Sequence, residues 1–126
     1  MENTNMNQSK ELERLGLNPR TADLSFINDG TAAKLDILSY SNALCRYTEN
    51  VVEIIPSWSF MEIFKQLPSE VESGGNKYKL GVNQEFIYYQ SPSKYLCYYS
   101  VSGGKYMEAI VNMVEYLVTN NLHQFK

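Results

Sequence analysis

Hydrophobic positions between residues 55 and 68 recur at the spacing of a short amphipathic helix. The apolar side chains at i, i+3, i+4 and i+7 are Phe60, Ile63, Phe64 and Leu67. Ser59 and Glu62 have the spacing of a capping box, and Pro68 disfavours helical backbone at the residue before it. The pattern predicts a capped helix over residues 59–67.

Trp58 stands directly before this helix, where a hydrophobic residue packs against one inside the first turn. Ile63 is the residue placed to receive it. A helix of this length is not stable alone, so its apolar face needs a packing partner. We therefore predict that Trp58 is largely buried.

Three later segments alternate apolar and polar residues with the period of a β-strand, over residues 77–82, 85–90 and 95–101. The connections between them are short, which places neighbouring strands antiparallel. The sequence predicts a three-stranded meander over residues 77–101, preceded by a polar loop at 69–76. A stripe of apolar residues then predicts a carboxy-terminal helix over 105–119 that covers the sheet.

The first part of the chain allows two interpretations. Alternation on either side of Asp29–Gly30 favours a hairpin over residues 22–40, followed by an irregular or helical segment at 41–50. Apolar residues spaced by three and four favour one long helix over 31–50 instead. Residues 1–8 are polar and expected to be disordered, with a short helix at 10–15 that Ser9 caps. The preferred reading is a single α+β domain over residues 9–126.

Composition excludes several classes of protein. The chain has 126 residues, 44% hydrophobic and 20% charged, with a net charge of −3, so bulk electrostatics do not favour nucleic acid. It has no apolar run as long as a membrane span and no apolar leader at its start, so we expect no membrane contact and a cytoplasmic location.

Catalytic chemistry has few candidate residues. The one histidine, His123, follows the last predicted helix, and Cys45 and Cys97 lack the spacing of a metal site or a disulfide framework. Both cysteines are expected to be buried free thiols. Nucleophile-elbow, Walker and dinucleotide-binding glycine patterns are absent from the sequence. We expect no enzyme activity, no cofactor and no metal.

Tyrosines are concentrated in the predicted sheet. Because side chains alternate between faces, part of this set must pack under the helices, with Phe86 and Leu80, and the rest is exposed. Residues 76–105 hold four lysines against Glu85, a local excess of +3. The candidate binding residues are Tyr88, Tyr89, Tyr95, Tyr98, Tyr99, Lys77, Lys79 and Lys94. Exposed tyrosines favour contact with a protein partner, or stacking on bases. The alternative is a solvated face on which cross-strand aromatic pairs only stabilise the sheet, because aromatic residues favour strands in any case.

A second, weaker candidate lies between the last strand and the last helix. Gly103 and Gly104 permit close backbone approach, and Lys105 adds a positive charge at the start of the helix. Such an arrangement can bind phosphate. Tyr106 occupies the position where a P-loop has serine or threonine, and ordinary turn chemistry explains the glycines equally well.

The chain resembles a group of small uncharacterised proteins of gut bacteria, their phages and mobile elements. The resemblance rests on residues 9–23, on residues 55–68, on residues 109–113 and on Leu117. It implies a phage or mobile-element context inside a bacterial host cell and no known activity, and it favours the hairpin over the long helix. Our leading hypothesis is a non-enzymatic protein-interaction module. The alternative is a binder of nucleotides or single-stranded nucleic acid that uses the tyrosines, the lysines and Gly103–Lys105.

Overall fold

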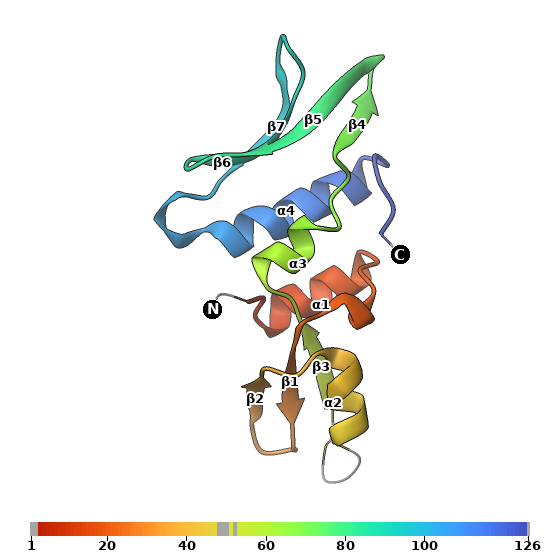
Figure 1. Cartoon of the computed structure of the whole chain (residues 1–126), viewed down its shortest axis with the longest axis vertical. Coiled ribbons are helices and arrows are strands. Elements are labelled where there is room, and N and C mark those ends of the chain that lie inside the picture. The colour runs from red at the N-terminus through yellow and green to blue at the C-terminus, as the bar shows by residue number, and fades with distance from the viewer. Residues whose placement is uncertain (1–2, 48–50, 52, 126) are drawn as a thin grey trace. The chain divides into compact units, whose positions relative to one another are not determined.

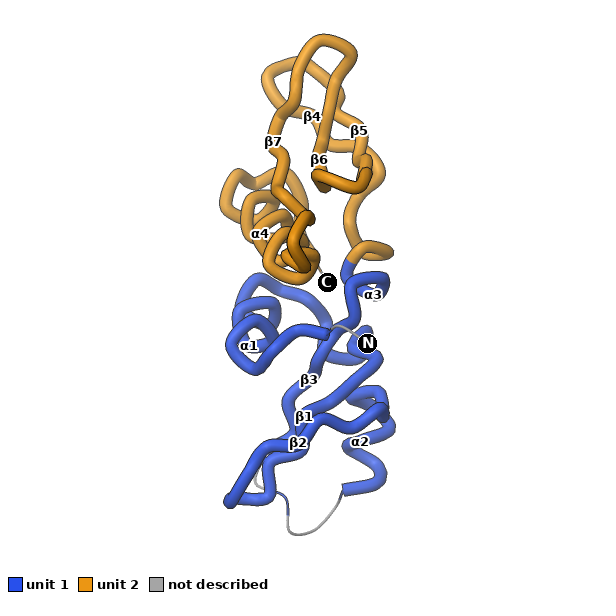
Figure 2. Tube along the Cα trace, turned by 90° about the vertical axis from the view of Figure 1, so that its left-hand side faces the viewer, with its two compact units in different colours: residues 1–63, 126 blue, residues 64–125 orange. Residues whose placement is uncertain are grey.

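The computed structural model describes residues 3–47, 51 and 53–125, and its fold class is α+β, which confirms the sequence prediction. The chain divides into two compact units, residues 1–63 with residue 126 and residues 64–125 (Figure 2). The expectation of one domain over residues 9–126 stays a prediction.

The first unit contains a three-stranded antiparallel sheet in the order β2-β1-β3 (Figure 1). Its strands are β1 (Leu24–Asn28), β2 (Ala33–Asp36) and β3 (Glu53–Ser57). β1 and β2 form the predicted hairpin, and helical backbone among residues 31–47 is confined to residues 40–46, so the alternative of one long helix is wrong. Residues 48–50 lie outside the described residues. β3 was not predicted, because Pro56 within a short apolar run argues against a central strand. β3 accommodates this proline as the neighbour of β1 at the end of the strand order.

Two α-helices and a short 3₁₀ helix complete this unit. They are α1 (Met6–Arg14), η1 (Pro19–Thr21) and α2 (Tyr40–Arg46). Both α1 and α2 contact β3. α2 lies in the segment that we expected to be irregular or helical, and Ser39 caps it by accepting from the amide of Asn42 at 3.3 Å.

The amino-terminal segment corrects the prediction of a disordered tail for residues 3–8, while residues 1 and 2 lie outside the described residues. α1 begins at Met6, four residues before the predicted start, and Asn5 rather than Ser9 is its cap. Asn5 Oδ1 accepts from the amide of Gln8 at 2.8 Å, and Gln8 Oε1 accepts from the amide of Asn5 at 3.0 Å. This reciprocal capping box uses asparagine and glutamine in a stretch that looks merely polar in the sequence.

Thr4 explains why this segment is ordered. Its side chain is fully buried, and its hydroxyl lies 2.8 Å from Ser9 Oγ. The same hydroxyl accepts from the amide of Trp58 at 3.0 Å, while Ser57 Oγ donates to the Thr4 carbonyl at 2.8 Å. Buried polar groups must be paired, so these bonds hold the amino terminus against the end of β3.

Trp58 is fully buried, which confirms the prediction. Its Nε1 donates to Thr21 Oγ1 at 2.9 Å, so the indole is both packed and hydrogen-bonded. The helix that follows, α3 (Phe60–Phe64), ends three residues earlier than predicted, in a turn where the amide of Leu67 donates to the Phe64 carbonyl at 3.1 Å. The amide of Ser59 donates to Asp23 Oδ1 at 2.8 Å, a partner that the capping-box pattern did not indicate.

The second unit contains a four-stranded antiparallel meander in the order β4-β5-β6-β7, with α4 (Tyr106–Thr119) packed against β6 and β7 (Figure 1). The strands are β4 (Glu70–Ser73), β5 (Asn76–Val82), β6 (Phe86–Gln90) and β7 (Tyr95–Ser100). The three predicted strands and the carboxy-terminal helix are confirmed. β4 was predicted to be a loop, because two of its residues are glutamates, which are depleted in strands.

We predict that Thr4→Val lowers the free energy of unfolding by about 1–3 kcal/mol, because it leaves the buried amide of Trp58 without its acceptor. Thermal and urea unfolding measure the change. Thr119→Val is the matched control at an exposed position, and we expect a change within about 0.5 kcal/mol. Equal stability of the two variants would contradict the anchoring role of Thr4.

Candidate functional site

The register of the β4–β7 sheet assigns its side chains to two faces. Tyr89 and Ile87 on β6 are fully buried. Across from Tyr89 lies Cys97, which contacts Met113 of α4 through the two sulfur atoms at 3.6 Å. This is the inner face, which packs on α4. The alternate residues of β6, Phe86 and Tyr88, point to the opposite, outer face.

Four aromatic side chains from β6 and β7 form one cluster on the outer face, which we call the aromatic cluster: Phe86, Tyr88, Tyr95 and Tyr98. Tyr98 meets Phe86 edge to face, with ring centroids 5.2 Å apart. Tyr95 meets Tyr88 edge to face at 5.6 Å and lies 5.4 Å from Tyr98. Tyr95 and Tyr98 are 48% and 57% exposed, so the cluster is open to solvent.

A β-bulge brings Tyr95 into this cluster. Strict alternation places Tyr95 on the face of Cys97 and Tyr99, opposite Tyr98. The register between β6 and β7 shifts at Tyr89/Gln90, so that Gln90 pairs with Tyr95 while Tyr89 pairs with Cys97. Leu96 is the extra residue, and it turns Tyr95 to the outer face. A bulge leaves no mark on hydrophobic alternation, so the sequence did not indicate this placement.

Two of the predicted binding tyrosines do not belong to the exposed surface. Tyr89 is fully buried, and its hydroxyl donates to the Pro68 carbonyl at 2.7 Å. Burial raises the pKa of Tyr89 above its ordinary value. Tyr99 is half-buried on the inner face, opposite Ile87 in the register. Phe86, expected to pack under the helices, lies in the aromatic cluster instead.

Gly81 supports Tyr88 from the neighbouring strand. The two residues are opposite each other in the β5–β6 register. A Cβ built on Gly81 would lie 2.5 Å from Tyr88 Cζ, closer than any real contact. The phenol ring therefore lies directly over the bare glycine backbone, an arrangement that fixes the ring and covers the glycine.

Lys77 and Lys79 occupy the outer face of β5, where both are exposed. β4 brings two carboxylates to the same face: Glu70 is opposite Lys79 and Glu72 is opposite Lys77. Lys77 Nζ lies 4.0 Å from Glu70 Oε1. The positive excess expected for residues 76–105 is thus balanced locally by a strand that the sequence analysis missed. Lys94 is exposed in the turn between β6 and β7, away from this pairing.

Two pockets open on the outer face, one on each side of β6. The first, of about 410 Å³, has Lys77, Lys79, Gln90 and the Tyr88 ring in its lining. We call it the lysine pocket. The second, of about 270 Å³, is lined by Phe86, Tyr95 and Tyr98 and is called the aromatic pocket. Glu70 and Glu72 line neither pocket.

The segment proposed for phosphate has a structural explanation. Gly103 and Gly104 have φ angles of 68° and 77°, a left-handed conformation that favours glycine. They lie in the short segment η2 (Ser102–Gly104), whose backbone is not helical at Gly103 and which turns the chain from β7 into α4. Lys105 is exposed at the start of α4. The turn accounts for both glycines, and the phosphate hypothesis stays a prediction.

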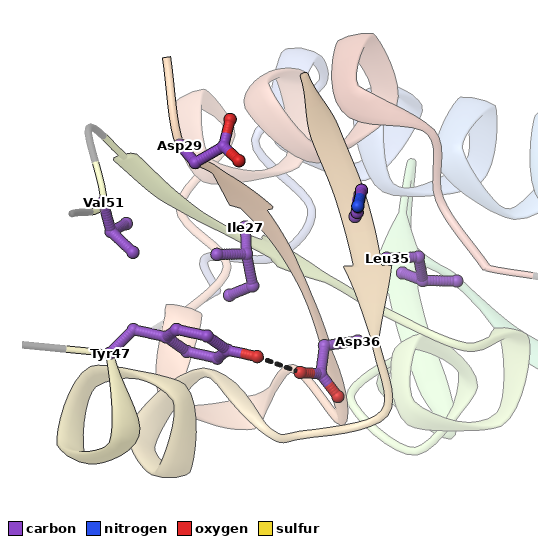
Figure 3. Close-up of a pocket in the computed structure, with 7 residues that line it drawn as sticks. Ile27, Asp29, Leu35, Asp36, Tyr47 and Val51 are labelled. Atoms are coloured by element: carbon purple, nitrogen blue, oxygen red, sulfur yellow. Dashed lines mark hydrogen bonds between the residues drawn. The ribbon is translucent and has the colours of Figure 1, made fainter. Parts of the chain in front are cut away.

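The first unit has a pocket of about 460 Å³ beside the β1–β2 hairpin (Figure 3). Tyr47 donates to Asp36 Oδ2 at 2.6 Å across it, and this bond raises the pKa of the Tyr47 phenol. Asp29 Oδ1 accepts from the amide and hydroxyl of Thr31 at 2.9 and 2.7 Å, which helps lower the pKa of Asp29 to about 2. Asp29 thus stabilises the turn of the hairpin, and Asp36 holds the end of α2 beside the hairpin through Tyr47.

The cysteines and the histidine lie in different surroundings. Cys45 is exposed, which corrects the expectation of burial, and Cys97 is half-buried with its thiol pKa raised to about 11 by burial. His123 stacks edge to face on Phe125 with centroids 4.6 Å apart. In the part of the chain that the structure describes, no three histidine, cysteine or acidic side chains gather as a metal site would need. No helix in that part has the length and apolarity to cross a membrane.

We predict that Gly81→Ala lowers the free energy of unfolding by about 0.5–1.5 kcal/mol, because the new methyl group displaces the Tyr88 ring from its edge-to-face contact with Tyr95. In a Tyr88→Ala background the same change becomes neutral or stabilising by up to about 1 kcal/mol, since alanine is otherwise preferred to glycine in a strand. Urea unfolding of the wild type, the two single variants and the double variant completes this double-mutant cycle. The same cost in both backgrounds would show that Tyr88 does not rest on Gly81.

We predict that protonation of Asp29 weakens the hairpin turn only near pH 2. The folded pKa of about 2 is below the ordinary 3.8, so the stabilisation is full above about 3.8 and is lost as the pH falls through about 2. The amide shift of Thr31, followed by NMR, measures the midpoint. Asp29→Asn keeps an oxygen acceptor and should remove the titration. A midpoint close to 3.8 in the wild type would contradict the hydrogen bonds to Asp29.

No model of a known protein family matches the chain, and neither a curated protein nor a solved structure matches it. The resemblance to small proteins of gut bacteria and phages therefore stays a prediction. Any function proposed for the chain rests on its own residues, above all on the outer face of the β4–β7 sheet.

Proposed function

We propose that this chain is a non-enzymatic interaction module that binds a protein partner through the outer face of its four-stranded sheet. The single observation that carries the proposal is the exposed aromatic cluster of Phe86, Tyr88, Tyr95 and Tyr98. The phage or mobile-element context and a cytoplasmic location in the host cell, which the sequence suggested, belong to the same proposal.

Contiguous aromatic side chains on a surface are a feature of binding sites. Tyrosine is enriched at protein interfaces because it offers a large contact area and a polar hydroxyl while losing little conformational freedom. Here the rings hold one another edge to face, and Tyr88 is further fixed over Gly81. A partner therefore meets rings that are already positioned, which reduces the entropy lost on binding.

Single-stranded nucleic acid is the second candidate, and the lysine pocket beside the Tyr88 ring is the observation that favours it. Glu70 and Glu72 on the same face weaken this alternative, because they reduce the positive potential that a phosphate chain requires. Fluorescence anisotropy with labelled oligonucleotides at about 50 mM salt tests it, since electrostatic affinity is largest at low salt. Binding that is lost in Lys77→Glu with Lys79→Glu would favour nucleic acid over a protein partner.

We predict that peptides selected on the wild-type protein lose their binding when the aromatic cluster is truncated. Phage-displayed random 12-residue peptides are panned on the folded chain, and the enriched sequences are synthesised. In the double variant Tyr95→Ala with Tyr98→Ala we expect affinity to fall at least about tenfold, because these exposed rings supply the contact area.

Tyr106→Ala is the matched control, because Tyr106 is 43% exposed and lies outside the sheet. Circular dichroism and thermal unfolding verify that each variant is folded. Failure to enrich any peptide, or equal loss of binding in the control, would argue against an interaction module that uses the aromatic cluster.

A further inference from the structure

We infer that the partner presents an extended segment in which an apolar and an acidic side chain stand two residues apart. The inference rests on the proposed function. It states which chemical group of the partner each of the two pockets on the outer face binds. The apolar side chain enters the aromatic pocket, and the carboxylate enters the lysine pocket.

The aromatic pocket selects an apolar group. All three residues that line it, Phe86, Tyr95 and Tyr98, contribute aromatic rings, and its volume of about 270 Å³ accommodates one large side chain. A leucine, methionine or phenylalanine placed there removes its own surface and that of two exposed tyrosines from water. A charged side chain would lose hydration without finding an opposite charge among these three residues.

The lysine pocket selects a carboxylate. Its lining includes Lys77, Lys79 and Gln90, so two flexible cationic side chains and one amide side chain can reach a carboxylate bound there. The nearest acidic strand is β4, on the other side of β5, and it contributes no residue to the pocket. The existing contact between Lys77 and Glu70 is exposed and 4.0 Å long, so it is worth little and can be exchanged for a partner's carboxylate.

The sheet geometry sets the spacing between the two groups. The aromatic pocket lies over β6 and β7 near the level of Tyr88, and the lysine pocket lies over β5 and β6 near the level of Gln90. One strand spacing across and two residues along the strand give a separation on the order of 8 Å. In an extended peptide, side chains i and i+2 point the same way and stand about 7 Å apart.

Charge distribution favours an acidic peptide over a nucleic acid strand as the occupant. A single carboxylate needs only the lysine pocket, whereas successive phosphates would also meet the carboxylates of Glu70 and Glu72 on this face. The aromatic pocket beyond β6 offers no cation in its lining for a second phosphate.

The experiment uses the peptides enriched on the wild-type chain. We expect them to share an apolar residue and an aspartate or glutamate two positions apart. Replacing that acid by the matching amide in the synthetic peptide should weaken binding about tenfold in fluorescence anisotropy, the size of one hydrogen-bonded charge.

A charge exchange locates the carboxylate. The double variant Lys77→Glu with Lys79→Glu should bind the acidic peptide more weakly. It should instead bind a peptide that carries lysine in place of the acidic residue. Lys94→Glu is the matched control, because Lys94 is equally an exposed lysine of this unit and lines neither pocket. Lys77→Gln with Lys79→Gln gives a second test if the glutamate pair disturbs folding, with weakened binding expected and no rescue by the lysine peptide.

Enriched peptides that are neutral or basic would overturn the inference and leave the interaction module standing. The inference is also overturned if the acid-to-amide change in the peptide does not weaken binding. It is overturned as well if Lys94→Glu weakens binding as much as Lys77→Glu with Lys79→Glu does. If no peptide is enriched on the wild type, both the inference and the proposed function fail.

Discussion

α4 covers one face of the β4–β7 sheet, and the period of two along each strand sends every second side chain to the other face. Ile87 and Tyr89 are therefore buried, while Phe86 and Tyr88 from the same strand emerge on the outer face. A run of aromatic residues in such a sheet cannot all serve the core. The aromatic cluster is the direct consequence of placing large side chains at consecutive positions of a strand that has a single packed face.

Two local devices shape this outer face. The bulge at Leu96 turns Tyr95 to the side of Tyr98, which increases the number of rings that meet there. Gly81 has no side chain opposite Tyr88, so the end of the Tyr88 ring occupies the space that a Cβ on Gly81 would need. The bulge interrupts the regular pairing of β6 and β7, and the glycine lowers the strand propensity of β5. Both features arrange aromatic rings on a surface exposed to solvent. Stability of the core alone does not require either of them.

Charge on the outer face is arranged in strips along the strands. β4 carries Glu70 and Glu72, β5 carries Lys77 and Lys79, and the aromatic cluster occupies β6 and β7. The acidic strip also marks an edge strand, where charged residues discourage pairing with another chain. A partner that crosses from the aromatic strip to the lysine strip meets apolar and then positive surface. The side chains of the outer face therefore change from acidic on β4 to basic on β5 and to aromatic on β6 and β7.

Local patterns in the sequence determined the elements with strong periodicity or short connections. Alternation and tight turns predicted the hairpin and the three strands after residue 76, the apolar stripe predicted α4, and the position of Trp58 before a helix start predicted its burial. Tertiary structure decided the features that depend on partners distant in the chain. Thr4 orders the amino terminus through its hydrogen bonds with Ser57 and Trp58. β4 is a strand because β5 pairs with it, and the bulge at Leu96 exists only in the register with β6. The composition of the outer face, with Phe86 included and Tyr89 excluded, follows from that register, because hydrogen bonds between strands leave no signal in either strand alone.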